Sequence, residues 1–373
     1  MGEIMSRGRS LKEAKNEKAK KKRRAKRRKR ILVLLVELLI LASLLCIGYM
    51  LLKYDKIQLD SFTGDDISIN QGVKNVGYTT IALFGGDSRE GQLGKGTHAD
   101  TIIVASIDND TKEVRMVSIY RDLLTMQSDD KVRKANSAYF NGGPKEAVNM
   151  LNRNFDLNIE DYVTVDFGIM AEVVDLLGGI EVNVTDEEAA EMNRHIVGTG
   201  EAVGKKAIFV NGGLQTLDGV QTVTYARIRK NVGGDYARTE RQRTVIQKVV
   251  EKVKGTDLAT INDIVNQSFS RISTNLTLKE IINMAANVKK YKLSESKGYA
   301  FEHTDGTIEG IGSVVIPLGV AENVEELHEF IYPKDTEYVV SDVVKTIATK
   351  IESLSGYTRE DYVEPNEPVE ESD

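Results

Sequence analysis

Apolar positions recur with two different spacings along most of this chain, and each spacing predicts a different element. Short β-branched or alternating runs predict strands at 79–84, 101–107, 114–119, 162–167 and 180–184. Apolar positions three or four residues apart predict helices at 144–155, 169–177, 239–255 and 339–354. A polar turn at 108–111 joins the second and third strands as a hairpin. Strands that alternate with helices in this way predict a three-layer α/β domain with a mixed central sheet.

The stretch 31–52 differs from the rest because it is almost entirely apolar. Its 22 residues include one charge, Glu37, and at about 1.5 Å per residue they could cross a hydrocarbon core of roughly 30 Å as one helix. Within 20–30, ten of eleven residues are basic. The positive-inside rule therefore predicts a cytoplasmic N-terminus and an extracellular remainder. A cleaved signal peptide, the alternative, would need a shorter apolar region that ends in small residues.

Charge separates the N-terminal segment from the rest of the chain. Residues 1–30 carry 15 Lys or Arg against 3 Asp or Glu, a net charge of +12. The whole chain has a net charge of −6, so the other residues together carry −18. A basic run is typical of nucleic-acid binding, but beside a membrane span it more simply sets topology and attracts anionic lipid. We therefore expect no nucleic-acid partner. The expected order is a basic cytoplasmic segment at 1–30, a transmembrane helix at 31–52, an extracellular stem at 53–76, a folded catalytic domain at 77–358 and an acidic disordered tail at 359–373.

The counts of cysteine and histidine exclude some classes of site. The chain has one cysteine, Cys46, so it has no disulfide framework and no cysteine-based zinc or iron–sulfur site. Its four histidines are too few to suggest a histidine-rich metal site.

Two aspartates lie at the ends of predicted strands. Asp87 follows the first strand and a Gly-Gly pair, and Asp100 precedes the second strand. If these strands are neighbours in the sheet, the two carboxylates come together, and beside phosphates they would hold Mg²⁺. Spacing alone leaves open the alternative that both aspartates merely cap turns.

Arginine and lysine residues gather around the start of the long third helix, within an otherwise acidic part of the chain, and this reversal of charge favours an anionic ligand. Arg227 and Arg229 alternate as on an extended segment, so their side chains should point the same way. Arg238 and Gln242 lie four residues apart on one face, near a positive helix N-terminus. Because guanidinium groups bind phosphate oxygens in pairs, the arrangement suits a pyrophosphate. Two alternatives remain: the arginines pair with carboxylates, and Gln242 forms a capping box with Thr239.

These residues fall in blocks whose order and spacing resemble the LytR-CpsA-Psr family, the membrane-anchored phosphotransferases of bacterial cell envelopes. The resemblance covers about 79–254. Its blocks are GGDSR at 85–89, HADT at 98–101, SIYRD at 118–122, KANSAY at 134–139, GGP at 142–144, DLLGGIEV at 175–182, YARIRK at 225–230 and RTERQR at 238–243. The short basic end and the single apolar span resemble the family as well.

The resemblance implies a three-layer α-β-α domain that transfers a glycopolymer from a polyprenyl-pyrophosphate carrier to peptidoglycan, outside the membrane. A phosphodiester forms, and polyprenyl phosphate leaves. The implied partners are the lipid-linked glycopolymer, the peptidoglycan acceptor and membrane lipid, and the implied cofactor is Mg²⁺ or Mn²⁺. Phosphoryl transfer needs positioning and charge neutralisation more than a covalent nucleophile, which agrees with a site of carboxylates and arginines.

The resemblance also implies a role for each matching residue. Asp87 and Asp100 would hold the metal ion. The pyrophosphate would be bound by Arg89, Arg121, Arg227, Arg229, Arg238 and Gln242. The expected catalytic set is Arg121, Asp122, Arg227 and Arg229. Asp122 is our hypothesis for the general base, because it follows the arginine that would hold the reacting phosphate.

Two residues depart from the family pattern. His98 stands where an arginine is usual, and Tyr120 stands where a proline is usual, but neither change removes an expected metal ligand. His98 either holds phosphate less well when it is neutral or has a structural role. The resemblance further implies an apolar tunnel for the lipid, which the helices at 147–155 and 169–177 would line unless their apolar stripes are plain core.

Two other functions fit the same residues. Water in place of the sugar hydroxyl would make the protein a polyprenyl-pyrophosphate phosphatase. Arginines that only bind would make it a non-enzymatic protein that holds wall polymer or anionic lipid. Turnover separates these alternatives, because a replacement of Arg121 abolishes chemistry in either enzyme, whereas a binding protein shows no chemistry in any form.

Overall fold

The computed structural model describes residues 66–74, 77–86, 93–268 and 271–362, together with 48, 49, 51, 52, 54, 57–59 and 62. The chain forms two compact units, Met1–Asp55 and Lys56–Asp373. The described residues of the first unit are helical. Across all described residues, no helix is both long and apolar enough to cross a membrane. Most of the transmembrane helix expected at 31–52 lies outside the described residues.

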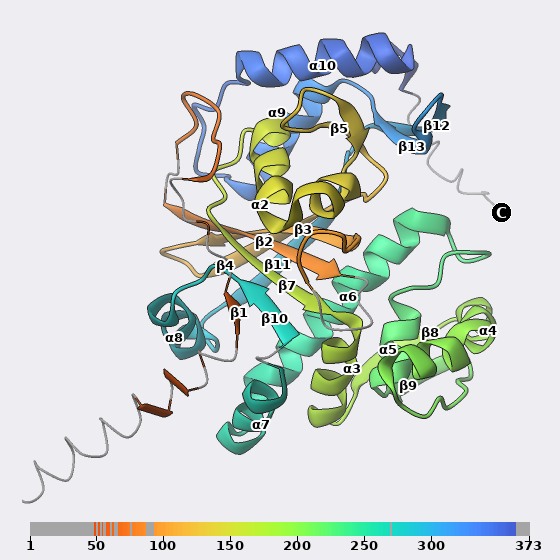
Figure 1. Cartoon of the computed structure of the whole chain (residues 1–373). Helices are drawn as coiled ribbons and strands as arrows, with labels where there is room; N and C mark the ends of the chain where they lie inside the picture. Colours follow the sequence, from red (N-terminus) through yellow and green to blue (C-terminus); the bar gives the residue numbers. More distant parts are fainter. Residues whose placement is uncertain are drawn as a thin grey trace, which may run out of the picture. The chain divides into compact units, whose positions relative to one another are not determined.

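A mixed sheet of seven strands forms the middle of the second unit (Figure 1). From edge to edge its strands are β1 (Gln58–Leu59), β10 (Ile272–Thr274), β7 (Asp161–Asp166), β2 (Tyr78–Gly86), β3 (Ala99–Asp108), β4 (Glu113–Ile119) and β11 (Lys292–Tyr299). β2, β3 and β4 form an antiparallel meander, whereas β7 lies parallel to β2 and β11 lies parallel to β4. The mixed sheet expected from the sequence is confirmed, and the four strands predicted for it are within two residues of their observed ends.

One face of the sheet carries the largest core. Because side chains alternate along a strand, Ala82 and Phe84 of β2 point to the same side as Ile102 and Val104 of β3. They pack under α2 (Asn136–Phe155), α9 (Val320–Ile331) and α10 (Asp342–Ser355), which cover this side in Figure 1. Two hairpins, β5 (Leu124–Met126) with β6 (Val132–Lys134) and β12 (His303–Ile308) with β13 (Gly312–Pro317), complete the layer.

The opposite face is covered less tightly. Ile81, Ile103 and Ala105 point to this side and pack under α6 (Gly234–Gly255) and α8 (Leu278–Asn287). α3 (Phe167–Leu176) and α7 (Leu258–Ser268) lie on the same side of the sheet (Figure 1). No residue of α8 is buried, and no described side chain of α7 is buried either. Helices on both faces confirm the three layers expected from the sequence.

A third core lies beside the sheet, smaller than the one under α2, α9 and α10. It joins the hairpin of β8 (Ile180–Val184) and β9 (Gly213–Leu217) to α4 (Asp186–Val203) and α5 (Gly219–Tyr225). Val174 of α3 and Val245 of α6 also belong to this core, so it is attached to the helices of the less tightly covered face. The strand predicted at 180–184 has the observed bounds.

The segment expected as an extracellular stem at 53–76 is corrected by its described residues, which pack onto the domain. β1 pairs with β10, and Phe62 stacks on Tyr162 with ring centroids 5.3 Å apart. Ile67 is buried in the largest core. The compact unit therefore begins at Lys56, not at residue 77. At the other end, Arg359 of the expected tail forms an ion pair with Glu302, and residues 363–373 lie outside the described residues.

Two of the predicted helices begin at other residues than expected. α2 begins at Asn136, eight residues earlier than the helix predicted at 144–155, and it kinks at Gly143, whose φ of 71° a glycine adopts without strain. α6 begins at Gly234, not at Thr239. The helices predicted at 169–177 and 339–354 correspond to α3 and α10.

The apolar stripes of α2 and α3 are core positions. Leu151 and Phe155 of α2 belong to the core under α9 and α10, whereas Val174 of α3 belongs to the separate core with β8 and α4. The two helices therefore do not share one apolar lining, and of the two alternatives that the sequence left open, plain core is favoured over a tunnel lined by both.

Candidate functional site

A bulge places Asp100 at the end of the sheet. β2 and β3 pair as Gly85 with Thr101 and then as Gly86 with Ala99, so Asp100 is the extra residue in β3. Bulges of this kind redirect a side chain and are frequent beside active sites. The residue before Asp87 thus pairs with the residue before Asp100, as the sequence predicted for neighbouring strands. Asp87 and Arg89 themselves lie outside the described residues.

Arg121 lies between the carboxylates of Asp100 and Asp122 at this end of the sheet. It follows β4, which pairs with β3, and its Nη1 lies 2.8 Å from Oδ1 of Asp100. Its Nε lies 3.4 Å from Oδ2 of Asp122, whose other oxygen lies 3.1 Å from Nζ of Lys134. Burial acts to lower the pKa of Arg121, but these carboxylates outweigh burial and raise it. Arg121 is therefore a permanently charged group held at a fixed position.

Asp235, in the first turn of α6, is the centre of the arginine cluster. Its Oδ1 lies 2.7 Å from Nη2 of Arg238 and 3.9 Å from both Nε of Arg121 and Nη1 of Arg229. Burial raises the pKa of Asp235, although the three arginines act in the opposite direction. Burial also lowers the pKa of Arg238 to about 10. Asp235 is not among the site residues expected from the sequence, although an acidic residue inside a basic run was the available signal.

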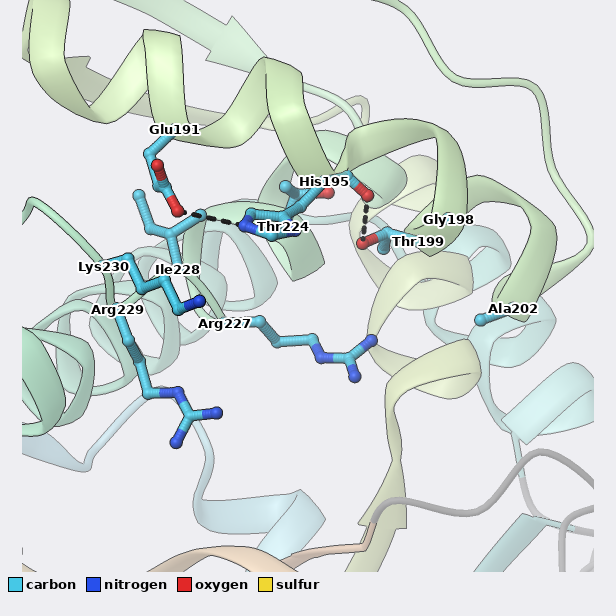
Figure 2. A pocket seen from close by; sticks show the side chains of 10 residues that line it. All are labelled: Glu191, His195, Gly198, Thr199, Ala202, Thr224, Arg227, Ile228, Arg229 and Lys230. Carbon is cyan, nitrogen blue, oxygen red and sulfur yellow. Dashed lines mark hydrogen bonds and ion pairs between the residues drawn. The ribbon is translucent and has the colours of Figure 1, made fainter.

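Arg227 and Arg229 lie on a turn, which corrects the extended segment expected from the sequence. The turn at 226–231 follows α5, and its first bond runs from the backbone N–H of Arg227 to the carbonyl of Thr224. Both side chains line the same pocket, but they extend in different directions from the turn (Figure 2). The guanidinium of Arg227 lies over the ring of Phe167, 4.7 Å from its centroid. Arg229 is exposed, with its guanidinium directed toward Asp235.

The expected capping box of Thr239 and Gln242 does not form. α6 begins five residues before Thr239, with Gly233 as its N-cap, and the hydroxyl of Thr239 donates to the carbonyl of Asp235. Nε2 of Gln242 donates to the carbonyl of Ala226 at 3.3 Å, so Gln242 contacts the start of the turn at 226–231 that carries Arg227 and Arg229. Gln242 therefore does not have the capping role that the sequence left open as an alternative to ligand binding.

Arg241 has a structural role within the basic block. It is 5% exposed, and its Nη2 donates to the carbonyl of Ile228 at 2.7 Å. Its Nη1 donates to the carbonyl of Val232 at 3.1 Å and lies 3.2 Å from a carboxylate oxygen of Glu188 on α4. Arg241 thereby fixes the turn that carries Arg227 and Arg229 between α6 and α4.

The two residues that depart from the family pattern both make aromatic contacts. His98 stacks on Phe140 with ring centroids 4.4 Å apart, so its structural alternative is favoured. Tyr120 packs edge-on against Tyr236 at 4.8 Å and also contacts His303. Since Tyr120 precedes Arg121 and Tyr236 follows Asp235, this contact joins the end of β4 to the start of α6.

Oxygen atoms at the end of the sheet suit a hard divalent cation. Asp100 supplies a carboxylate that is 19% exposed, and carboxylates are the ligands Mg²⁺ prefers. Among the described residues, no three His, Cys, Asp or Glu side chains lie close enough together to hold a metal ion. The donor chemistry fits Mg²⁺, and a complete site at this position would need Asp87 as well.

Several buried atoms of the cluster have no hydrogen-bond partner within the described part of the chain. They are Nε of Arg121 and Nε of Arg238, two guanidinium donors, whereas Oδ1 of Asp235, which also lacks a hydrogen bond, is ion-paired with Arg238 at 2.7 Å. Buried polar atoms without partners cost stability unless a ligand or water satisfies them. The arrangement can therefore bind an anion with several oxygens, and it can neutralise charge that develops on a phosphoryl group.

Curated relatives and solved structures are similar to much of the chain. Polyisoprenyl-teichoic acid–peptidoglycan teichoic acid transferase TagU of Bacillus licheniformis is 30% identical over 241 residues, which are 62% of this chain and 71% of TagU. The transferase TagV of Bacillus subtilis is 28% identical over 205 residues, 53% of this chain and 50% of TagV. The crystal structure of protein gbs0355 from Streptococcus agalactiae has a TM-score of 0.58 and 23% identity, and the likeness covers 71% of this chain and 91% of that one.

The sequence blocks, the sheet and the arginine cluster agree with one family match. A further solved structure, the LytR-CPS2A-psr family protein YwtF (TagT) with bound octaprenyl pyrophosphate lipid, has the same fold, with a TM-score of 0.51 and 19% identity over 71% of this chain and 99% of that one. The model of the LytR_cpsA_psr family matches residues 52–326, which is more than half of the chain. The chain therefore belongs to the LytR_cpsA_psr family.

Proposed function

We propose that this protein transfers a glycopolymer from a polyprenyl-pyrophosphate carrier to peptidoglycan and forms a phosphodiester link. The observation that carries this proposal is the meeting of Arg121, Arg229 and Arg238 around Asp235, where the buried Nε donors of Arg121 and Arg238 have no hydrogen-bond acceptor among the described residues. Pyrophosphate offers the many oxygen atoms that such a cluster can bind. Without ligand, Asp235 balances part of the positive charge.

The names of relatives support the same reaction. TagU and TagV are named polyisoprenyl-teichoic acid–peptidoglycan teichoic acid transferases, and TagT, which shares the fold, has a structure with bound octaprenyl pyrophosphate lipid. The match spans half of TagV and 71% of TagU. The residues that match the family model, 52–326, include all described arginines of the cluster.

The reaction needs positioning and one proton transfer. The acceptor hydroxyl attacks the phosphorus that carries the glycopolymer, the bond from this phosphorus to the bridging oxygen breaks, and polyprenyl phosphate leaves with the electron pair. Arg121, Arg227, Arg229 and Arg238 bind the phosphoryl oxygens, and Gln242 supports the turn. Asp122 is our choice for the general base that takes the hydroxyl proton, because it adjoins Arg121 at 3.4 Å.

A divalent cation is part of the proposal. Asp100, with Asp87, would hold Mg²⁺ or Mn²⁺, and the ion would neutralise charge on the pyrophosphate. Arg121 already contacts one oxygen of Asp100, so the same carboxylate would orient the arginine and hold the ion. Arg89, which follows Asp87 in the sequence, would bind pyrophosphate beside them.

The membrane location is also a proposal. The apolar stretch 31–52 would anchor the chain as a single transmembrane helix, and the basic segment before it would keep the N-terminus in the cytoplasm. The domain that begins at Lys56 would then lie outside the membrane, where peptidoglycan is.

The lipid chain would lie against the less tightly covered face of the sheet. Ile246 of α6 and Met284 of α8 pack on Ile103 and its neighbours, but both remain partly exposed. An isoprenoid that entered between these helices and the sheet would bury their apolar surface, at about 25 cal/mol for each Å² removed from water.

Turnover by the full chain tests the proposal. The chain is incubated with an octaprenyl-pyrophosphate-linked saccharide, Mg²⁺ and a peptidoglycan fragment, and both products are followed by mass spectrometry. We expect a phosphodiester-linked product, and we expect Arg121→Ala to lower turnover by about 10²- to 10³-fold. Arg133→Ala is the matched control, because among the described residues Arg133 pairs only with the exposed Asp129.

Two outcomes contradict the transferase. Release of phosphorylated saccharide without linkage to the acceptor identifies a phosphatase. Binding of the donor without any turnover, in the presence of Mg²⁺ and acceptor, identifies a protein that only holds the polymer or lipid.

A further inference from the structure

A pocket of about 380 Å³ opens beside the arginine cluster, between α4 and the turn at 226–231 (Figure 2). We name it the side pocket. Its volume lies within the range of roughly 300–1,000 Å³ that is typical of small-molecule sites. Arg227 and Arg229 line it, and the same two arginines belong to the proposed pyrophosphate site. A ligand could therefore extend from the cluster into the side pocket without leaving the protein surface.

The lining of the side pocket is positively charged. Arg227, Arg229 and Lys230 form one wall, and Lys230 is exposed, without an ion pair to any described residue. The carboxylate that faces them, Glu191, is only 2% exposed and is already paired with Arg194 at the surface. Because the carboxylate is neutralised and the lysine is not, the side pocket favours an acid group.

The opposite wall offers the polar groups that sugar hydroxyls need. His195 and Thr199 come from α4, and Nε2 of His195 lies 3.0 Å from Oε1 of Glu191 (Figure 2). Between them Gly198 leaves room, since a Cβ added there would meet nothing within 4 Å. A few fixed polar groups around open space are typical of sites that orient a small polar ligand.

We propose that the side pocket binds a sugar unit that carries an acid group, either phosphate or carboxylate, next to the pyrophosphate of the donor. The inference rests on the proposed function and specifies its substrate class: the glycopolymer is acidic at or near its first sugar. Arg227 and Arg229 would contact the pyrophosphate from one side of the turn, and Lys230 would contact the acid group.

Binding of four probes to the full chain tests this inference. They are octaprenyl pyrophosphate alone and octaprenyl pyrophosphate linked to N-acetylglucosamine, to N-acetylglucosamine 6-phosphate or to glucuronic acid. Lys230→Gln removes one positive charge from the side pocket, and Gly198→Leu fills the space without a clash at Cβ. Lys252→Gln, at an exposed lysine in the last turn of α6, is the matched control for charge.

The unchanged protein should bind at least one acidic donor about tenfold more tightly than the neutral donor, and the better of the two identifies the acid as phosphate or carboxylate. Lys230→Gln should reduce this preference about threefold, a modest change because the lysine is exposed and screened by salt. Gly198→Leu should abolish the preference. None of the variants should change binding of octaprenyl pyrophosphate alone.

Equal binding of the neutral and both acidic donors by the unchanged protein overturns the inference. So does a preference that survives Gly198→Leu in full. Failure of the proposed function looks different, because it appears in the turnover assay, as donor that is hydrolysed without linkage to the acceptor or is bound without any reaction, and it leaves the preference among the four probes unchanged.

Discussion

The two faces of the central sheet use the same strands but are packed differently. Under α2, α9 and α10, residues such as Leu151 and Ile347 have no exposed surface at all. Under α6 and α8, Ile246 and Met284 contact the sheet yet stay partly exposed, and Ile282 of α8 is 40% exposed. The strands alone do not cause this difference, because Ile102 and Ile103 are buried on opposite faces.

The difference separates the part of the molecule that stabilises the fold from the part that is available for a ligand. A filled core leaves no room for another molecule, and truncation of its side chains lowers the free energy of unfolding. Where apolar residues remain partly exposed, a ligand that covers them removes apolar surface from water, which favours binding. We call the first side the closed face and the side under α6 and α8 the open face.

The largest effect is expected on the closed face. Leu151→Ala removes a completely buried side chain from the core under α9 and α10 and should lower the free energy of unfolding by about 4 kcal/mol. Denaturant unfolding of the full chain measures it.

The matched change on the open face is Met284→Ala. Because Met284 is only partly buried, we expect a loss below about 1 kcal/mol. Equal losses for the two variants would mean that both faces are packed alike and would remove the distinction.

A smaller effect is expected at Arg241, where α6 passes from the arginine cluster to the open face. Arg241→Leu leaves the carbonyls of Ile228 and Val232 without their donor and should cost about 2 kcal/mol of stability. Affinity for octaprenyl pyrophosphate should fall too, because the turn that carries Arg227 and Arg229 is no longer fixed. Both quantities are compared with those of Lys248→Leu, at an exposed lysine of the same helix.

A loss of stability at Arg241 without a change in affinity would contradict the positioning role. It would mean that the turn keeps its conformation without the arginine.

The open face itself is tested with the lipid. Ile246→Gln should weaken binding of octaprenyl pyrophosphate about fivefold to tenfold, a change of about 1 kcal/mol, because a polar side chain replaces apolar contact surface. Binding of inorganic pyrophosphate, which has no chain, should not change. A variant that weakens both equally would show that Ile246 acts through the arginine cluster and not through the lipid.

The smallest effect concerns the edge where β7 meets α8. Burial, with Glu280 and Glu160 nearby, raises the pKa of Asp161 from 3.8 to about 6. The folded state thus holds the proton more tightly than the unfolded state, so stability falls as pH rises from about 4 to about 6 and stays lower above it. Asp161→Asn should remove this fall and raise stability at pH 7 by about 1 kcal/mol, less than the full shift implies because Asp161 is half-buried.

Unfolding measured at pH 4 and at pH 7 in both proteins checks the prediction. If Asp161→Asn stabilises the protein equally at the two values, the cause is not the ionisation of this carboxyl group.

The sequence predicted the strands and the blocks of charged residues well, because both depend on local pattern. The alternation in 101–107 and 114–119 is visible without any long-range contact, and the spacing of Asp100 from Arg121 follows from a hairpin between adjacent strands. The bulge at Asp100 was not predictable, since it depends on the register between two strands.

The parts that the sequence did not predict depend on tertiary contacts. Asp235 and Arg241 belong to one basic block of the sequence, but their roles depend on the folded structure. Asp235 lies among arginines and pairs with Arg238, whereas Arg241 pairs with Glu188 of α4 and has a structural role. α6 begins at Gly234 and not at Thr239, and its first turn makes tertiary and local contacts that the capping pattern does not include: Asp235 pairs with Arg238, and Tyr236 packs against Tyr120. The stem was similarly misassigned, since Phe62 finds a partner 100 residues away in Tyr162.

Asp156 connects three segments that are far apart in the chain. It ends α2 in the left-handed region, is completely buried, and accepts hydrogen bonds from Asn70, Tyr338 and Ser341. Asn70 belongs to the segment through which the chain enters the domain, and Ser341 is the N-cap of α10. A pulling force applied at the N-terminal end of the chain would first meet β1 on β10 and Phe62 on Tyr162, and only when these contacts had separated would it reach the closed face through Asn70 and this carboxylate.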